Sequence, residues 1–120
     1  MYRVIVAVLM MTAGSLGALA QGYGSQSNPE QTTGRYWLPI CENPSQNFRC
    51  VDVVNGLNDG HAQLVSLQRI AAPYCPGNAT LGTLTDVAVA YVRRNYHLSH
   101  MRFTDLALAA WIEAWPCRRY

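Results

Sequence analysis

The sequence has 120 residues, half of them hydrophobic, with nine basic and seven acidic residues and a formal net charge of +2. A chain of this length has enough apolar side chains for one small core, so we expect a single folded domain. The basic residues are all arginine and are scattered apart from two adjacent pairs, Arg93-Arg94 and Arg118-Arg119. Because the chain is nearly neutral and lacks a concentrated basic face, we do not expect it to bind nucleic acid.

Residues 1–20 have the pattern of a signal peptide. Met1-Tyr2-Arg3 gives a basic start, an apolar run continues to Ala13, and Ala18-Leu19-Ala20 fits the small-residue motif that signal peptidase cleaves. The apolar run is short for a membrane-spanning helix and has no basic stop-transfer flank. We therefore expect cleavage before Gln21 and no stable membrane insertion. Without Arg3, eight arginines remain against seven acidic residues, a net charge of +1.

Residues 21–34 are expected to form a flexible tether. They are rich in Gly, Ser, Gln, Asn and Thr and contain no aliphatic residue, so they have too little apolar surface to order themselves. We expect a helical domain over residues 35–120. Pro39 lies among the apolar residues between Arg35 and Cys41, which favours a single helical turn or an extended segment there.

Three longer segments have the spacing of apolar residues that is typical of helices. The first runs from Cys50 to a stop before Pro73, and its glycines Gly56 and Gly60 lie four residues apart, which could let another helix approach closely. Its expected buried stripe is Val54, Leu57, His61, Leu64 and Val65.

The second and third segments lie in the C-terminal half. Thr80 is a suitable N-cap for a helix from Leu81 to about Asn95, and Ser99 could cap a helix from His100 to Trp115 that Pro116 ends. Their expected buried stripes are Leu84, Val87, Ala88, Tyr91 and Val92 in the second, and Phe103, Leu106, Ala107, Ala110, Trp111 and Ala114 in the third. The fold expected from these patterns is all-α, with three main helices and a short N-terminal segment.

All four cysteines, Cys41, Cys50, Cys75 and Cys117, follow the expected cleavage site. An even number of cysteines in a small exported domain indicates two disulfides, and the short paired spacings of a zinc site are absent. Three pairings are possible. We favour the local one, which joins Cys41 to Cys50 and Cys75 to Cys117.

The sequence contains no recognisable catalytic arrangement. A nucleophile elbow, a phosphate loop and a His-Glu-x-x-His motif are all missing. His97 and His100 could share a metal with Asp105 or Glu113, but two histidines at a helix start are more often solvated surface residues. We expect a protein that is not an enzyme and that uses no metal or other cofactor.

Several of these residues together resemble a known family. The series begins with Cys50, Gly56 and Asp59 and continues with Tyr74-Cys75-Pro76 and Thr80-Leu81-Gly82-x-Leu84-x-Asp86-Val87. It ends with Ala110-x-x-x-Ala114-Trp115-Pro116-Cys117. From Tyr36 to Cys117, the chain resembles the Rap/Tai-type immunity domain of bacterial type VI secretion systems.

That resemblance implies an exported, helical, disulfide-bonded protein of the periplasm that binds and blocks a peptidoglycan amidase toxin, and it allows a homodimer. The residues that carry over are those of the scaffold, namely Cys50, Gly56, Asp59, Cys75, Thr80, Pro116 and Cys117. For contacts with the partner we select the exposed loop around Arg93, Arg94, Tyr96 and His97 and the turn Pro76-Gly77-Asn78, since arginines and aromatics are common interface anchors. The alternative function is a periplasmic structural or stress-related binding protein that has no toxin partner.

Overall fold

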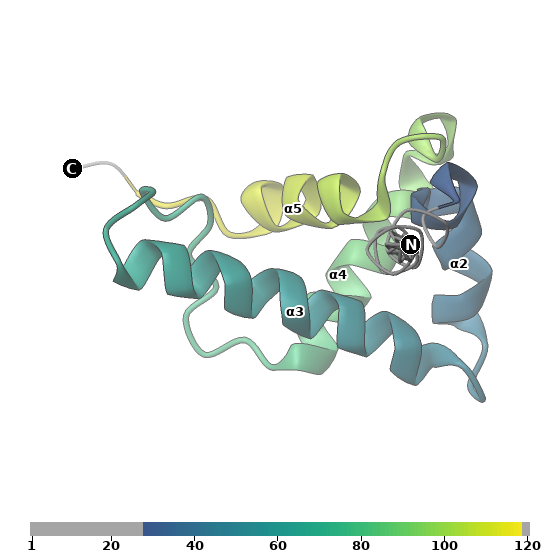
Figure 1. Cartoon of the computed structure of the whole chain (residues 1–120), viewed down its shortest axis with the longest axis horizontal. Coiled ribbons are helices and arrows are strands. Elements are labelled where there is room, and N and C mark those ends of the chain that lie inside the picture. The colour runs from purple at the N-terminus through teal and green to yellow at the C-terminus, as the bar shows by residue number, and fades with distance from the viewer. Residues whose placement is uncertain (1–27, 119–120) are drawn as a thin grey trace, which may run out of the picture.

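The computed structural model of the chain describes residues 28–118, so the expected signal peptide and residues 21–27 of the expected tether lie outside the described residues (Figure 1). Residues 28–118 form four α-helices and two short 3-10 helices, with no β-strand. The elements in chain order are η1 (Pro29–Thr32), α2 (Gly34–Glu42), α3 (Asn47–Ser66), α4 (Leu81–Arg94), η2 (Tyr96–Leu98) and α5 (Phe103–Ala114). The all-α prediction is confirmed, although the expected three main helices omit α2.

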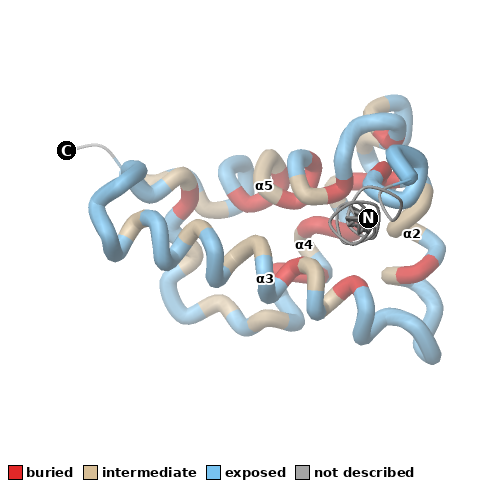
Figure 2. The backbone as a smooth tube through the Cα atoms, viewed as in Figure 1, coloured by how far each residue is buried: buried red, intermediate tan, exposed pale blue. Residues whose placement is uncertain are grey.

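The core lies between α4 and α5, and α4 contacts each of the other three α-helices (Figure 2). From α5, Phe103 and Trp111 are fully buried, and the Trp111 Nε1–H donates to the Leu84 carbonyl of α4 over 2.9 Å. This bond satisfies the polar atom of a large apolar side chain, so burial of the ring leaves no unpaired donor. The expected stripes of α4 and α5 are buried at most positions, but Val87 and Tyr91 are half-buried and Ala114 is exposed.

Helix α2 corrects the expectation of a single turn or an extended segment before Cys41. It spans nine residues with Pro39 inside it. Proline removes the backbone N–H that would bond to the Arg35 carbonyl, one helical turn earlier. Both Arg35 and Pro39 lie on the exposed side of the helix, where water can bond to that carbonyl instead.

The start of α2 is anchored to the loop before α5. The backbone N–H of Gly34 donates to the Met101 carbonyl and that of Arg35 to the Ser99 carbonyl, each over 2.9 Å, while the Thr33 hydroxyl caps the N–H of Tyr36. Thr33 and Gly34 are buried. The expected tether is therefore too long at its C-terminal end, because residues 28–34 form η1 and a fixed entry into α2.

Helix α3 ends at Ser66, several residues earlier than the expected stop before Pro73. At its C-terminus the Arg69 N–H donates to the Leu64 carbonyl, and the Gln68 N–H donates to the Val65 carbonyl. Gln68 has a φ of 57°, the left-handed conformation that ends helices in this manner. Leu64 is 42% exposed, so the expected buried stripe is wrong at that position.

The glycines of α3 do not mark a helix contact. A Cβ atom added to Gly56 or Gly60 would meet no heavy atom within 4 Å. The close approach occurs at Gly34, where an added Cβ would lie 2.6 Å from the Leu106 Cδ1 of α5. The expectation of a close helix approach on α3 is therefore wrong.

Helix α4 starts as expected. The Thr80 hydroxyl accepts from the Thr83 N–H over 3.1 Å, and the helix runs from Leu81 to Arg94. Helix α5 starts three residues later than expected, after Arg102. Ser99 does not cap it, because this residue is buried in the turn after η2 and its carbonyl accepts from α2.

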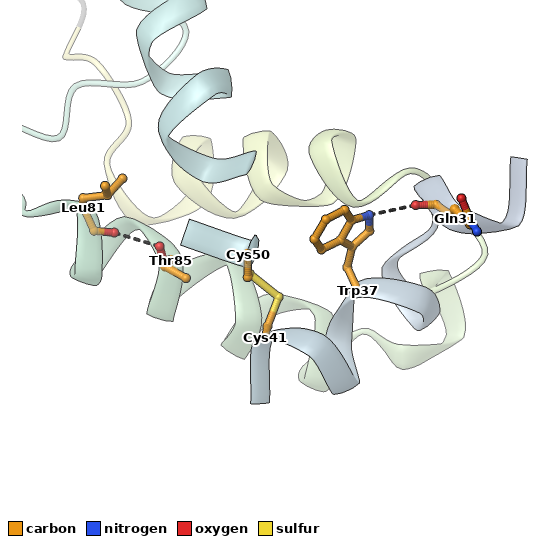
Figure 3. The surroundings of a disulfide bond; sticks show 6 residues. All are labelled: Gln31, Trp37, Cys41, Cys50, Leu81 and Thr85. Atoms are coloured by element: carbon orange, nitrogen blue, oxygen red, sulfur yellow. Dashed lines mark hydrogen bonds between the residues drawn. A yellow bond between two sulfur atoms is a disulfide. The ribbon is translucent and has the colours of Figure 1, made fainter. Parts of the chain in front are cut away.

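Two disulfides fix the ends of this arrangement. Cys41 is bonded to Cys50, joining α2 to α3 (Figure 3), and Cys75 is bonded to Cys117, joining the loop before α4 to the segment after α5. These are the local pairs favoured from the sequence. On the chain-entropy model the loop of 9 residues contributes roughly 2.5 kcal/mol of stability and the loop of 42 residues roughly 4 kcal/mol.

Candidate partner-binding surfaces

The two arginines selected from the sequence lie at the C-terminal end of α4 and form ion pairs with neighbouring helices. Arg93 contacts Glu42 of α2 over 3.0 Å, and Arg94 contacts Glu113 of α5 over 3.7 Å. Both pairs are largely exposed, so each contributes little to stability. The arginines therefore remain available to a partner, but binding through them has to compete with these acids.

Tyr96 and His97 follow in η2, which continues directly from the end of α4. Tyr96 is 57% exposed and His97 is exposed. The structure therefore places Arg93, Arg94, Tyr96 and His97 in one short stretch between α4 and the loop to α5. We call these four residues the α4-end surface.

Arg93 also lines an open groove of about 600 Å³ between α2, α3 and α4. The groove includes Glu42 and Asp86, together with small and apolar residues of α4 such as Gly82 and Val89. This surface has mixed charge. Residues 28–118 contain no group of three or more His, Cys, Asp or Glu side chains placed to hold a metal ion.

The second stretch selected from the sequence, Pro76–Asn78, is a turn closed by the Ala79 N–H, which donates to the Pro76 carbonyl over 3.1 Å. Gly77 has a φ of 59°, a left-handed backbone conformation that residues with a side chain adopt only at an energetic cost. Pro76 lies against a pocket, whereas Gly77 and Asn78 are exposed. Pro76 therefore links this turn to a second candidate surface.

That surface is centred on Tyr74, which the loop after α3 folds back onto the core. The Tyr74 ring lies 5.1 Å from the Trp111 ring and 6.2 Å from the His61 ring, measured between centroids. Its hydroxyl donates to the Asn58 Oδ1 over 2.7 Å. Burial raises the pKa of Tyr74 above its ordinary value of 10.0, because the ionised phenol would lose solvation.

Beside Tyr74 lies an open pocket of about 240 Å³, which we call the Tyr74 pocket. Its walls come from the C-terminal half of α3 and from the loop that follows, at Val65, Ala72 and Pro73 among others. This pocket is not among the surfaces expected from the sequence. Its only signal was His61 on an apolar stripe, and the pocket forms because α3 ends early and the chain turns back.

The family of Rap1a immunity proteins matches residues 33–117. The chain belongs to the Rap1a immunity protein family. The match begins at the buried Thr33 and ends at the disulfide-bonded Cys117, so the Rap1a match covers all four α-helices.

Comparisons with curated proteins and with solved structures found no match. Membership of the Rap1a family implies an immunity function, in which the protein binds a toxin partner. Within residues 28–118, no helix is both long and apolar enough to cross a membrane.

Proposed function

We propose that this Rap1a family protein is exported to the periplasm, where it binds and blocks a peptidoglycan amidase toxin delivered by a type VI secretion system. The observation that carries the proposal is the family match over residues 33–117. The amidase is proposed from the sequence resemblance to immunity domains that block such toxins, above all from the closing Trp115-Pro116-Cys117.

The covalent structure supports the periplasm as the compartment. Both disulfides join residues of the folded domain and leave no free cysteine in residues 28–118. Such bonds persist in oxidising compartments and are rare in the bacterial cytoplasm. The signal-peptide pattern in residues 1–20 provides the export route. A blocker in this compartment would meet the toxin where its peptidoglycan substrate lies.

The mode of action that we propose is binding without catalysis. Two disulfides and a buried core hold the α4-end surface and the Tyr74 pocket in fixed positions. A surface that is ordered before binding loses little conformational entropy when the complex forms, which favours a tight inhibitor.

The test begins with tagged, oxidised protein of residues 21–120, which is mixed with extracts of its own organism and of close neighbours. Each captured peptidoglycan hydrolase is then expressed, and its cleavage of purified peptidoglycan is measured with increasing amounts of the protein. We expect amidase activity to disappear near a 1:1 ratio. Reduced and alkylated protein is the control and should not inhibit.

A captured hydrolase that keeps full activity at excess protein would contradict the proposal. The same conclusion would follow if periplasmic co-expression did not prevent lysis by that hydrolase. Extracts that contain such hydrolases but yield no complex would favour the alternative of a structural periplasmic protein.

A further inference from the structure

The Tyr74 pocket contains hydrogen-bonding atoms that no other described residue uses. The first is on His61, whose Nδ1 lies 3.0 Å from the Leu57 carbonyl oxygen. A carbonyl oxygen only accepts, so Nδ1 must carry the proton in this contact. In the neutral ring, Nε2 is then a free acceptor on a residue that lines the pocket.

The second is on Asn58, one helical turn before His61 on the same face of α3. Because Asn58 Oδ1 accepts from the Tyr74 hydroxyl, the amide is oriented with its Nδ2 hydrogens free to donate. In residues 28–118 no buried side-chain nitrogen or oxygen lacks a partner. The two unpaired atoms of His61 and Asn58 are therefore reachable from solvent.

The rest of the pocket is mostly apolar, with walls that include Val65, Ala72, Pro73 and Pro76. Its volume of about 240 Å³ exceeds the roughly 150 Å³ of an apolar cavity that takes up benzene. One aromatic ring therefore fits. A ligand that matches both parts of the pocket has a flat apolar ring and one polar group. That group donates a hydrogen bond to the His61 Nε2 and accepts one from the Asn58 Nδ2.

The surroundings of the pocket favour a protein as the source of that ring. Leu64 and Leu67, at the end of α3, are 42% and 61% exposed, and Ile70, in the loop that leads to the pocket, is 39% exposed. None of the three lines the pocket, but Leu64 adjoins the wall residue Val65 in the chain and Ile70 lies two residues before Ala72. Exposed apolar residues beside a pocket are typical of a protein contact, in which an aromatic anchor enters the pocket. A free small molecule would leave these residues uncovered.

We infer that the Tyr74 pocket binds the side chain of a tyrosine presented by a protein partner, with its hydroxyl between His61 and Asn58. The hydroxyl donates to the His61 Nε2 and accepts from the Asn58 Nδ2, while the ring occupies the apolar walls. A phenylalanine makes neither hydrogen bond. The inference rests on the proposed function only for the identity of the partner, which is the toxin.

The pocket is tested with N-acetyl-L-tyrosinamide and N-acetyl-L-phenylalaninamide, titrated into oxidised residues 21–120 and followed by NMR. We expect saturable shifts of the His61 and Asn58 side-chain signals, and binding of the tyrosine amide at least about fivefold tighter than that of the phenylalanine amide. His61→Phe keeps a ring beside Tyr74 but removes the acceptor, so only the bond from Asn58 remains and the preference for tyrosine should fall at least about twofold.

Two further variants sharpen this test. Asn58→Asp keeps an oxygen for the Tyr74 hydroxyl and removes the donor, so it should also reduce the preference. His100→Phe, at an exposed histidine that does not line the pocket, is the matched control and should leave the preference unchanged. Equal binding of the two amides to the wild-type protein, or a preference that is undiminished in His61→Phe, would overturn the inference.

The partner is tested with the captured hydrolase. Val65→Arg places a long charged side chain in the pocket from a position at the edge of the core, and folding is checked by the fluorescence of the buried Trp111. We expect the affinity for the hydrolase to fall at least tenfold, and an unchanged affinity would overturn the assignment of the pocket to that partner. If the protein discriminates between the two amides but captures no hydrolase, the tyrosine site stands and the immunity function is refuted. Failure of the tyrosine site can therefore be distinguished from failure of the immunity function.

Discussion

Gly34 is the position where a single methyl group tests the packing most directly. Its Cα faces α5 so closely that an added Cβ would lie 2.6 Å from the Leu106 Cδ1, and 3.4 Å from both the Ser99 carbonyl oxygen and the Val92 Cγ1. Leu106 is only 1% exposed, so its side chain has no open space into which it can turn. Gly34→Ala therefore forces either the side chain or the start of α2 to move.

The expected effect is the difference between two terms. Inserting a methyl group into a filled core costs about 1–3 kcal/mol. Alanine in place of glycine in a helix gains at most about 1 kcal/mol, and less at the first position of α2. We expect Gly34→Ala to lower the free energy of unfolding by roughly 1–2 kcal/mol.

The assay is urea unfolding of oxidised residues 21–120, followed by tryptophan fluorescence, to which the buried Trp111 contributes. Gly56→Ala and Gly60→Ala are matched controls, because an added Cβ meets nothing within 4 Å at either position. Each control should raise the free energy of unfolding by about 0.5–1 kcal/mol.

A double-mutant cycle identifies the cause. Leu106→Val removes the Cδ1 atom, so Gly34→Ala should cost close to nothing in that background. The reasoning would be refuted if Gly34→Ala matched the two controls, or if its cost were the same with leucine and with valine at position 106.

Three further predictions concern the cap, the second disulfide and the buried phenol. Thr80→Ala removes the acceptor for the Thr83 N–H and should lower the free energy of unfolding by about 1 kcal/mol in urea unfolding; no change would show that water replaces the cap. The double substitution Cys75→Ser with Cys117→Ser opens the loop of 42 residues. It should lower the free energy of unfolding by roughly 4 kcal/mol, whereas wild-type stability would contradict this bond in solution. Because the pKa of Tyr74 is raised on folding, the unfolded chain ionises first, and stability should fall as pH rises above about 10. Tyr74→Phe should lose this part of the alkaline decline when unfolding is measured at several pH values, and an unchanged decline would refute the assignment.

The helices that could be predicted best are those whose signals are local. Helix α4 has a capping threonine at Thr80 and an apolar stripe, and both features lie within the helix. The stop of α3 could not be predicted, because a glutamine, Gln68, occupies the left-handed position where glycine is the usual signal. Helix α2 was missed because Pro39 is disfavoured inside a helix unless the affected carbonyl faces water.

The two candidate surfaces also differ in how local their sequence signals are. The α4-end surface is contiguous in sequence, so its exposed Tyr96 could be selected from the chain alone. The Tyr74 pocket depends on residues 16 positions apart, joined by the hydrogen bond from Tyr74 to Asn58. No periodic pattern encodes that contact, because it results from where α3 ends and how the following loop turns.

The connectivity of the two disulfides has a consequence for how the covalent structure is reached. Each bond joins cysteines that are neighbours in chain order, and the two loops neither overlap nor enclose one another. A chain that enters an oxidising compartment with its N-terminal end first would expose Cys41 and Cys50 before Cys75 and Cys117. Pairing each cysteine with the next one to emerge would give the native bonds. Uncatalysed disulfide rearrangement takes minutes to hours, so this consecutive order allows the chain to mature without a disulfide isomerase.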